Sequence, residues 1–195
     1  RAGFGATPSE LDTLTSEKTY EELVDDLVNP ERFPEVDQSF VDRYYGGEAV
    51  AVYVGNWLYR MVNTERPLEE KMALFLHQLF PVAWGKSEHH PSIKTEIDMF
   101  RRVGLTNFRT ILLELSRDPA MINWLDNNEN HKNEINENYG RELLELFSMG
   151  VGNYTEQDIK ECARAFTGWT IANREYMELR SQRDSDWPSG RIAWH

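Results

Sequence analysis

Signals that begin a helix recur along this chain, and they constrain its fold more than any other sequence feature. Thr7, Pro8 and Glu10 combine a capping box with a proline at the first helical position, where a backbone N–H is not needed. Comparable caps stand at residues 19–22, 118–119 and 155–158, and Thr106 is expected to cap a further helix. Each cap satisfies backbone groups at a helix start, so helices are expected to begin at all five places.

Apolar residues between these caps fall at three- and four-residue spacing, which is the period of one helix face. The pattern predicts helices in several segments, among them 48–62, 67–79, 93–103 and 136–149. Loops are expected at 31–47, 85–91 and 126–135. No segment of convincing length alternates apolar and polar residues as a strand would. The sequence therefore predicts an all-α fold, an irregular bundle of about seven to nine helices in a single domain spanning residues 1–195.

The composition excludes several classes of protein. With 40% hydrophobic residues the chain can bury a core, so wholesale disorder is excluded. Its 21 Lys and Arg against 33 Asp and Glu give a net charge of −12 without a basic stripe, which argues against nucleic-acid binding. Uninterrupted apolar runs are only a few residues long, so no membrane insertion is expected.

Cys162 is the one cysteine of the sequence, so no disulfide can form within the chain. Its helical position among apolar residues favours a buried small hydrophobe over a reactive thiol. A single cysteine of this kind fits the cytoplasm, but it does not exclude an exported protein.

The segment at residues 126–137, between two predicted helices, has the oxygen spacing of a calcium-binding EF-hand loop. Its first, third, fifth, ninth and twelfth places hold Asp126, Asn128, Asn130, Glu134 and Glu137, which are the candidate ligands for Ca²⁺. His131 stands where such a loop needs glycine, and Asn133 stands where it usually has an apolar residue. The alternative is an asparagine-rich turn in which Asn136 caps the next helix.

Glu137, Arg141 and Glu142 share the helix that follows this loop. In a functional interpretation they are catalytic residues of a polar cleft, and Arg141 holds an anionic group through two guanidinium nitrogens. In a structural interpretation they form ion pairs along the helix and a buried arginine–carboxylate tie between helices. His77 lies beside the apolar stripe of its own helix, where it is either a catalytic base or metal ligand, or a hydrogen-bonded core residue.

Several stretches of the chain together resemble one known family. They read RAGFGATP at 1–8, PLEEKMALFLH at 67–77, NFR at 107–109, RDPAM at 117–121, NENYGRELLELF at 136–147 with Gly150 after it, and ARAFTGW at 163–169. Their order and spacing are similar to those of the bacterial domain of unknown function 1800 family. Members of that family are typically more than twice this length, so the resemblance implies that the chain is the N-terminal part of a longer protein.

The resemblance implies no particular reaction, because the family has none established. Many members are thought to be exported and are often encoded beside sulfatase-like proteins of unknown role. This implies a periplasmic or extracellular location, while a cytoplasmic one stays open. Leu76 stands where the family usually has tryptophan, and Leu79 where it often has a second histidine. Any ligand site built from those residues in relatives would be incomplete in this chain.

Two functions from different classes agree with the sequence. The first is an exported enzyme with a polar cleft at Asp126, Glu137, Arg141 and Glu142, assisted by a hard cation. The second is a non-catalytic helical binding or assembly module, in which a protein partner or the protein's own C-terminal region covers an apolar face. The positions of these polar residues in the folded protein distinguish the two functions. Convergence of the polar residues with His77 in one pocket favours the enzyme, and dispersal as surface pairs favours the module.

Overall fold

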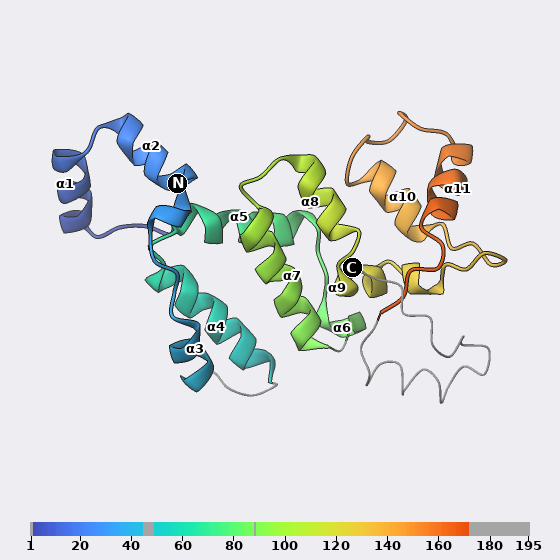
Figure 1. Cartoon of the computed structure of the whole chain (residues 1–195), viewed down its shortest axis with the longest axis horizontal. Coiled ribbons are helices and arrows are strands. Elements are labelled where there is room, and N and C mark those ends of the chain that lie inside the picture. The colour runs from blue at the N-terminus through green and yellow to red at the C-terminus, as the bar shows by residue number, and fades with distance from the viewer. Residues whose placement is uncertain (1, 45–48, 88, 172–195) are drawn as a thin grey trace. The chain divides into compact units, whose positions relative to one another are not determined.

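The computed structural model describes residues 2–44, 49–87 and 89–171. These residues form eleven α-helices, nine of them seven residues or longer, and no strand occurs among them (Figure 1). The all-α prediction is therefore confirmed, with additional short helices. Within the same residues, no helix combines the length and the apolar character needed to cross a membrane.

The chain divides into two compact units. The first comprises Arg1–Pro81 and Ile97–Ile111, and the second comprises Val82–Glu96 and Leu112–His195. One boundary falls inside helix α7 (His90–Val103), so this helix contributes residues to both units. That residues 1–195 make a single domain stays a prediction.

The first unit holds helices α1 to α5, together with the C-terminal half of α7 and the first residues of α8. Its complete helices are α1 (Pro8–Glu17), α2 (Tyr20–Val28), α3 (Gln38–Tyr44), α4 (Val50–Asn63) and α5 (Pro67–Leu79), and a 3₁₀ turn, η1 (Pro30–Arg32), follows α2. Both α1 and α2 begin with the predicted capping boxes. In these, Thr7 and Thr19 accept hydrogen bonds from the backbone N–H groups of Glu10 and Glu22.

Helix α3 lies inside segment 31–47, for which the sequence predicted a loop. Asp37 explains the difference, because its Oδ1 accepts a hydrogen bond from the backbone N–H of Ser39 at 2.9 Å and so caps the helix.

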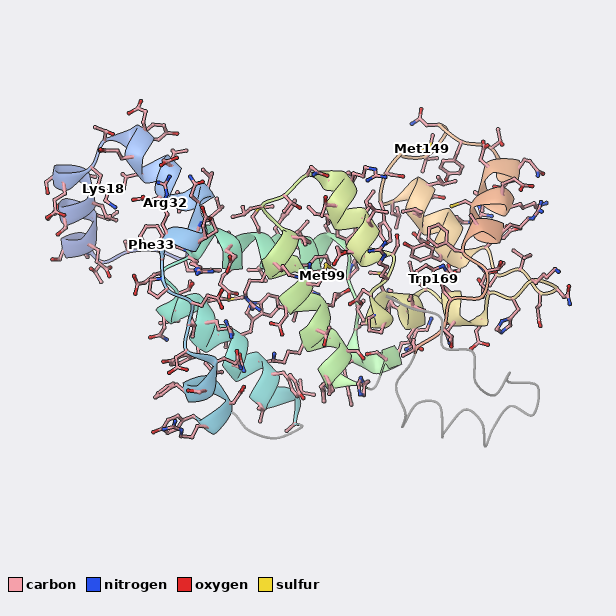
Figure 2. The ribbon with its side chains drawn as sticks, viewed as in Figure 1. Lys18, Arg32, Phe33, Met99, Met149 and Trp169 are labelled. Atoms are coloured by element: carbon pink, nitrogen blue, oxygen red, sulfur yellow. The ribbon has the colours of Figure 1, made fainter. Side chains whose placement is uncertain are left out.

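The helices before α3 are joined by ion pairs. Lys18 and Arg32, which are labelled in Figure 2, pair with aspartates of α2. No residue of α1 or α2 is fully buried, so these two helices add little to the core.

The core of the first unit lies between α5 and α7. Ala73 and Leu76 of α5, Phe80 just after it, and Phe100 and Val103 of α7 are almost completely buried. The rings of Phe80 and Phe100 stack with their centroids 6.0 Å apart. This apolar contact fixes α5 against the C-terminal half of α7.

The second unit holds the N-terminal half of α7 and the last residues of α8 (Phe108–Leu115). Its complete helices are α6 (Trp84–Ser87), α9 (Pro119–Trp124), α10 (Asn138–Glu145) and α11 (Glu156–Ala165), with the 3₁₀ turn η2 (Asn127–Glu129) after α9. Asp118 and Thr155 cap α9 and α11 as predicted. Segment 85–91 was wrongly predicted as a loop throughout, because α6 extends to Ser87 and α7 begins at His90.

The start of α8 differs from the prediction by one residue. Thr106 was the expected cap, but its hydroxyl donates to the carbonyl of Val103 at 2.7 Å. Asn107 caps the helix instead, since its Oδ1 accepts from the backbone N–H of Thr110 at 3.0 Å. The two neighbouring residues both suit a helix start, and sequence alone ranked them in the wrong order.

Helices α10 and α11 pack side by side in the second unit (Figure 1). Gly140 allows this close approach, because a Cβ atom there would lie 2.9 Å from the backbone nitrogen of Ala163. The phenol of the buried Tyr139 donates to Ser116 Oγ at 2.7 Å, and its ring meets Phe166 edge-on at 4.9 Å. The motif at residues 136–147 therefore contains helix α10, and its Tyr139 side chain is buried in the interior of the second unit.

Candidate functional site

The first part of the asparagine-rich segment after α9 is buried. Asn127, Asn128 and Asn130 expose 1%, 2% and 0% of their surface. Asparagine is usually exposed, and a buried amide is costly unless its hydrogen bonds are made within the protein. These three asparagines therefore belong to an internal polar structure, while residues 132–135 are exposed.

Asn130 is the centre of this structure. Its Nδ2 donates to the carbonyl of Ala163 at 2.8 Å and to Asn127 Oδ1 at 3.2 Å. Its Oδ1 accepts from the backbone N–H of Asn136 at 3.1 Å, and its own carbonyl accepts from the N–H of Gly168 at 2.9 Å. One side chain thus ties η2, the start of α10 and the end of α11 together.

Four of the five predicted ligands for Ca²⁺ have side-chain partners in the protein. Asp126, in a left-handed conformation with φ of 57°, pairs with Lys86 Nζ at 2.6 Å. Glu134 lies in an exposed turn closed by backbone hydrogen bonds with His131. Glu137 Oε2 lies 3.4 Å from Arg141 Nη2. In the described part of the chain, no three His, Cys, Asp or Glu side chains form a group suited to a metal ion. Binding of Ca²⁺ by this loop stays a prediction.

The guanidinium of Arg141 makes a bidentate ion pair. Its Nη1 and Nη2 donate to the two carboxylate oxygens of Glu156 at 3.0 and 2.9 Å, and Nη2 also reaches Glu137. The pair is open to solvent, since the Arg141 and Glu156 side chains are 37% and 68% exposed. The hydrogen bonds from Arg141 lower the pKa of Glu156. Partial burial, with the nearby charge of Glu145, raises the pKa of Glu142. Arg141 thus pairs along α10 and across to α11, but the tie between the two helices is exposed, where the structural interpretation expected a buried one.

His77, the fourth predicted catalytic residue, belongs to the other unit. Its ring meets the indole of Trp57 edge-on, with centroids 5.6 Å apart. Glu137, Arg141 and Glu142 all lie in the second unit. The four residues are therefore not brought together within either unit, and their catalytic roles stay predictions.

A buried ionic cluster in the first unit was not anticipated. Glu70 of α5 is 1% exposed. It receives hydrogen bonds from Arg101 at 2.5 and 3.1 Å and from the indole Nε1 of Trp57 at 3.1 Å, and Arg60 Nη1 lies 3.9 Å away. Burial and the neighbouring Arg101 charge lower the pKa of Arg60. Glu70 stands three residues before Ala73 and six before Leu76, and this spacing to two apolar residues was the signal in the sequence, since the structure buries all three on one face of α5.

Two further buried acids were not predicted from the sequence. Glu96 of α7 and Asp118 at the cap of α9 expose 0% and 4% of their surface. Burial and the charge of Glu96 raise the pKa of Asp118 to about 7. Glu96 stands three and four residues before the buried Met99 and Phe100, so the stripe of α7 itself indicated burial.

The outer face of α4 is apolar and open. Val50, Val54, Leu58 and Val62, here called the apolar ridge, recur every four residues and are 46%, 51%, 56% and 80% exposed. The helix has one charged residue, Arg60, whose side chain is 11% exposed and lies beside Glu70. The ridge therefore carries no charge of its own helix.

Comparison with known proteins identifies the family and nothing beyond it. No curated protein and no solved structure matches the chain. One family model, described as Protein of unknown function (DUF1800), matches residues 1–189. That match spans nearly the whole sequence and agrees with the motifs at residues 67–77 and 136–147. The chain is a member of the DUF1800 family.

Proposed function

We propose that this chain is a non-catalytic helical assembly module, and that the apolar ridge of α4 is the surface by which it binds another protein. The single observation that carries the proposal is the pattern of exposure on α4. A helix with apolar residues on both faces is usually packed against other protein on both faces. In α4, the face that carries the apolar ridge is exposed. Exposed contiguous apolar surface of this kind marks interaction sites.

The polar residues support the same proposal. Arg141 is occupied by Glu156 and Glu137, Asn130 by backbone and side-chain partners, and Glu70 by Arg101. Each of these groups has a structural partner within its own unit. The exposed ion pairs of Arg141 are the kind of surface pair expected of a module.

The occupant that we propose for the ridge is an apolar helix of a partner protein with few acidic side chains. A second copy of this chain is disfavoured, because two molecules with a net charge of −12 each repel one another. The protein's own C-terminal region is the other source of such a helix. From the family resemblance we also propose that the module works outside the cytoplasm.

The second candidate is an enzyme with a polar, cation-assisted cleft. The observation that favours it is the pKa of Asp118, raised to about 7, because general acids and bases work best with pKa values near the working pH. Against it, Asp118 is only 4% exposed. A substrate would need α9 to move before it could meet this carboxyl.

Site-specific photo-crosslinking on α4 tests the module. A photoreactive residue replaces Val54 or Val62 in the protein expressed in its own host, and Tyr20, which is 76% exposed on α2, takes the same residue as control. The proposal predicts crosslinks from both ridge positions to one partner polypeptide. Leu58→Glu is expected to abolish them, and the Tyr20 position is expected to give none.

Each other outcome has a definite meaning. A crosslink within the same polypeptide assigns the ridge to the protein's own C-terminal region. A crosslinked homodimer, or equal crosslinking from the Tyr20 position and the ridge, contradicts the proposal. Persistence of the crosslinks in Leu58→Glu contradicts it as well, because the added charge would then not disturb the supposed contact.

A further inference from the structure

Helix α3 carries two exposed aromatic side chains next to α4 (Figure 1). Phe40 and Tyr44, here called the aromatic pair, are 38% and 67% exposed, and their ring centroids lie 4.7 Å apart. The residue by which α3 reaches the core is Val41, which is completely buried. Burial in the core of the first unit therefore does not explain the large ring of Tyr44.

The aromatic pair is continuous with the apolar ridge of α4. The ring of Phe40 stacks on that of Tyr59, with centroids 5.6 Å apart. Tyr59 stands three residues before Val62 on α4, and residues at this spacing are neighbours on the surface of a helix. Val62, at 80%, is the most exposed member of the ridge. A row of aromatic rings therefore leads from the end of the ridge to Tyr44.

The apolar ridge alone is small for a stable protein interface. Its four partly exposed aliphatic side chains offer on the order of 300–400 Å², about half of the roughly 800 Å² that each protein buries in a standard complex. Two exposed aromatic rings add on the order of 200 Å² beside the ridge. Single exposed apolar residues are normal on a protein surface, but a contiguous patch of this size indicates a binding surface.

The chemistry of this patch favours an apolar partner. Tyrosine is enriched among the interface residues whose truncation weakens binding most, because a large rigid ring loses little conformational entropy when it is covered. The charged residue of α4 does not interrupt the patch, since Arg60 donates a hydrogen bond to Gln38 and lies 3.9 Å from the buried Glu70. Ridge and rings together therefore fit the uncharged face of a helix.

We propose that the aromatic pair is the second part of the surface that binds the partner helix, so that the bound helix covers α3 as well as α4. This inference rests on the proposed function, because it assigns further residues to the same contact. The apolar face of the partner helix lies along the ridge and continues past Val62 onto the rings of Phe40 and Tyr44. Tyr44, the more exposed of the two, supplies most of the added contact.

Photo-crosslinking from α3 tests where the partner lies. The photoreactive residue replaces Tyr44, Val54 or Val62 in the protein expressed in its own host, and mass spectrometry identifies the crosslinked peptides. All three positions are expected to crosslink to one segment of one partner polypeptide, and Leu58→Glu is expected to abolish all three crosslinks. Ridge crosslinks without one from Tyr44, or a Tyr44 crosslink to a different protein, would overturn this inference and leave the proposed function standing. No crosslink from any position would contradict both.

Removal of the ring tests its contribution to binding. With the photoreactive residue at Val54, Tyr44→Ser is expected to lower the crosslink yield at least about fivefold, and Tyr44→Phe is expected to keep it, because the ring makes the contact. Tyr20→Ser is the matched control, since Tyr20 is a 76% exposed tyrosine of the same unit, and it should leave the yield unchanged. The midpoint of urea unfolding should be the same in all three variants. An unchanged yield in Tyr44→Ser, or an equal fall in Tyr20→Ser, would overturn the inference.

Discussion

Arg101 and Glu70 form a two-point ion pair inside the first unit, with Nε 2.5 Å from Oε1 and Nη2 3.1 Å from Oε2. The side chains of Glu70 and Arg101 are only 2% and 14% exposed. The pair connects α5 to α7 beside the stacked Phe80 and Phe100. The ion pair gives the buried Glu70 carboxylate a fixed partner, so removal of Arg101 is expected to lower the free energy of unfolding.

Arg101→Ala is expected to destabilise the chain by about 3–5 kcal/mol, because it leaves the buried Glu70 carboxylate without its main partner. The measurement is the free energy of unfolding in urea. Arg117→Ala is the control, since that side chain is 49% exposed and its ion pair is longer, at 3.5 Å. The control should change stability by less than about 1 kcal/mol. Equal losses in the two variants would contradict the assignment.

Asn130→Ala is expected to cost about 3 kcal/mol, because three hydrogen bonds of its buried amide are lost and their partners remain. Asn133→Ala, at an exposed position of the same segment, is expected to change stability by less than about 0.5 kcal/mol. Urea unfolding compares both with the wild type. An Asn130→Ala variant as stable as Asn133→Ala would show that the segment is not the internal tie described above.

Addition of Ca²⁺ is expected to leave the melting temperature unchanged. Asp126 is paired with Lys86, and both amide atoms of Asn130 bind protein groups, so the loop would have to rearrange before it could coordinate a cation. Differential scanning calorimetry at millimolar Ca²⁺ makes the comparison. A rise in melting temperature that Glu137→Gln removes would establish the EF-hand interpretation instead.

Cys162 is expected to react slowly with alkylating reagents. The residue is a half-buried free thiol, and burial raises its pKa, so little thiolate is present near neutral pH. Alkylation by iodoacetamide at pH 7.5 should be at least about tenfold slower than that of glutathione, and unfolding in urea should restore the full rate. A folded-state rate equal to that of glutathione would contradict this account of the thiol.

The sequence predicted the helices where local chemistry decides the structure. Thr7, Thr19, Asp118 and Thr155 all cap helices as expected, because a cap involves residues only three apart. Helix α3 was missed because it is short and its cap, Asp37, stands in a segment with many turn residues. Local sequence patterns therefore predict the start of a helix well, but they predict poorly whether a short helix forms at all.

The polar contacts were harder to predict, because they depend on which helices meet. Arg141 was expected to pair along its own helix and with a carboxylate of another helix, but the sequence did not indicate that Glu156, fifteen residues away on α11, supplies that carboxylate. Glu96 carries a charge and was not considered for the core, although its spacing from Met99 and Phe100 places it on the buried face. A charged residue on a buried stripe indicates a partner in the fold, and sequence alone does not name that partner.

The measurement that tests the central claim most directly is the stability of Leu58→Glu beside that of Leu76→Glu. Leu58 lies on the apolar ridge and is 56% exposed, whereas Leu76 is 3% exposed in the core. If the ridge is a free surface that awaits a partner, Leu58→Glu changes the unfolding free energy by less than about 1 kcal/mol, while Leu76→Glu loses more than about 4 kcal/mol. Comparable losses in the two variants would mean that the ridge is packed within this chain, and the proposed binding surface would be contradicted.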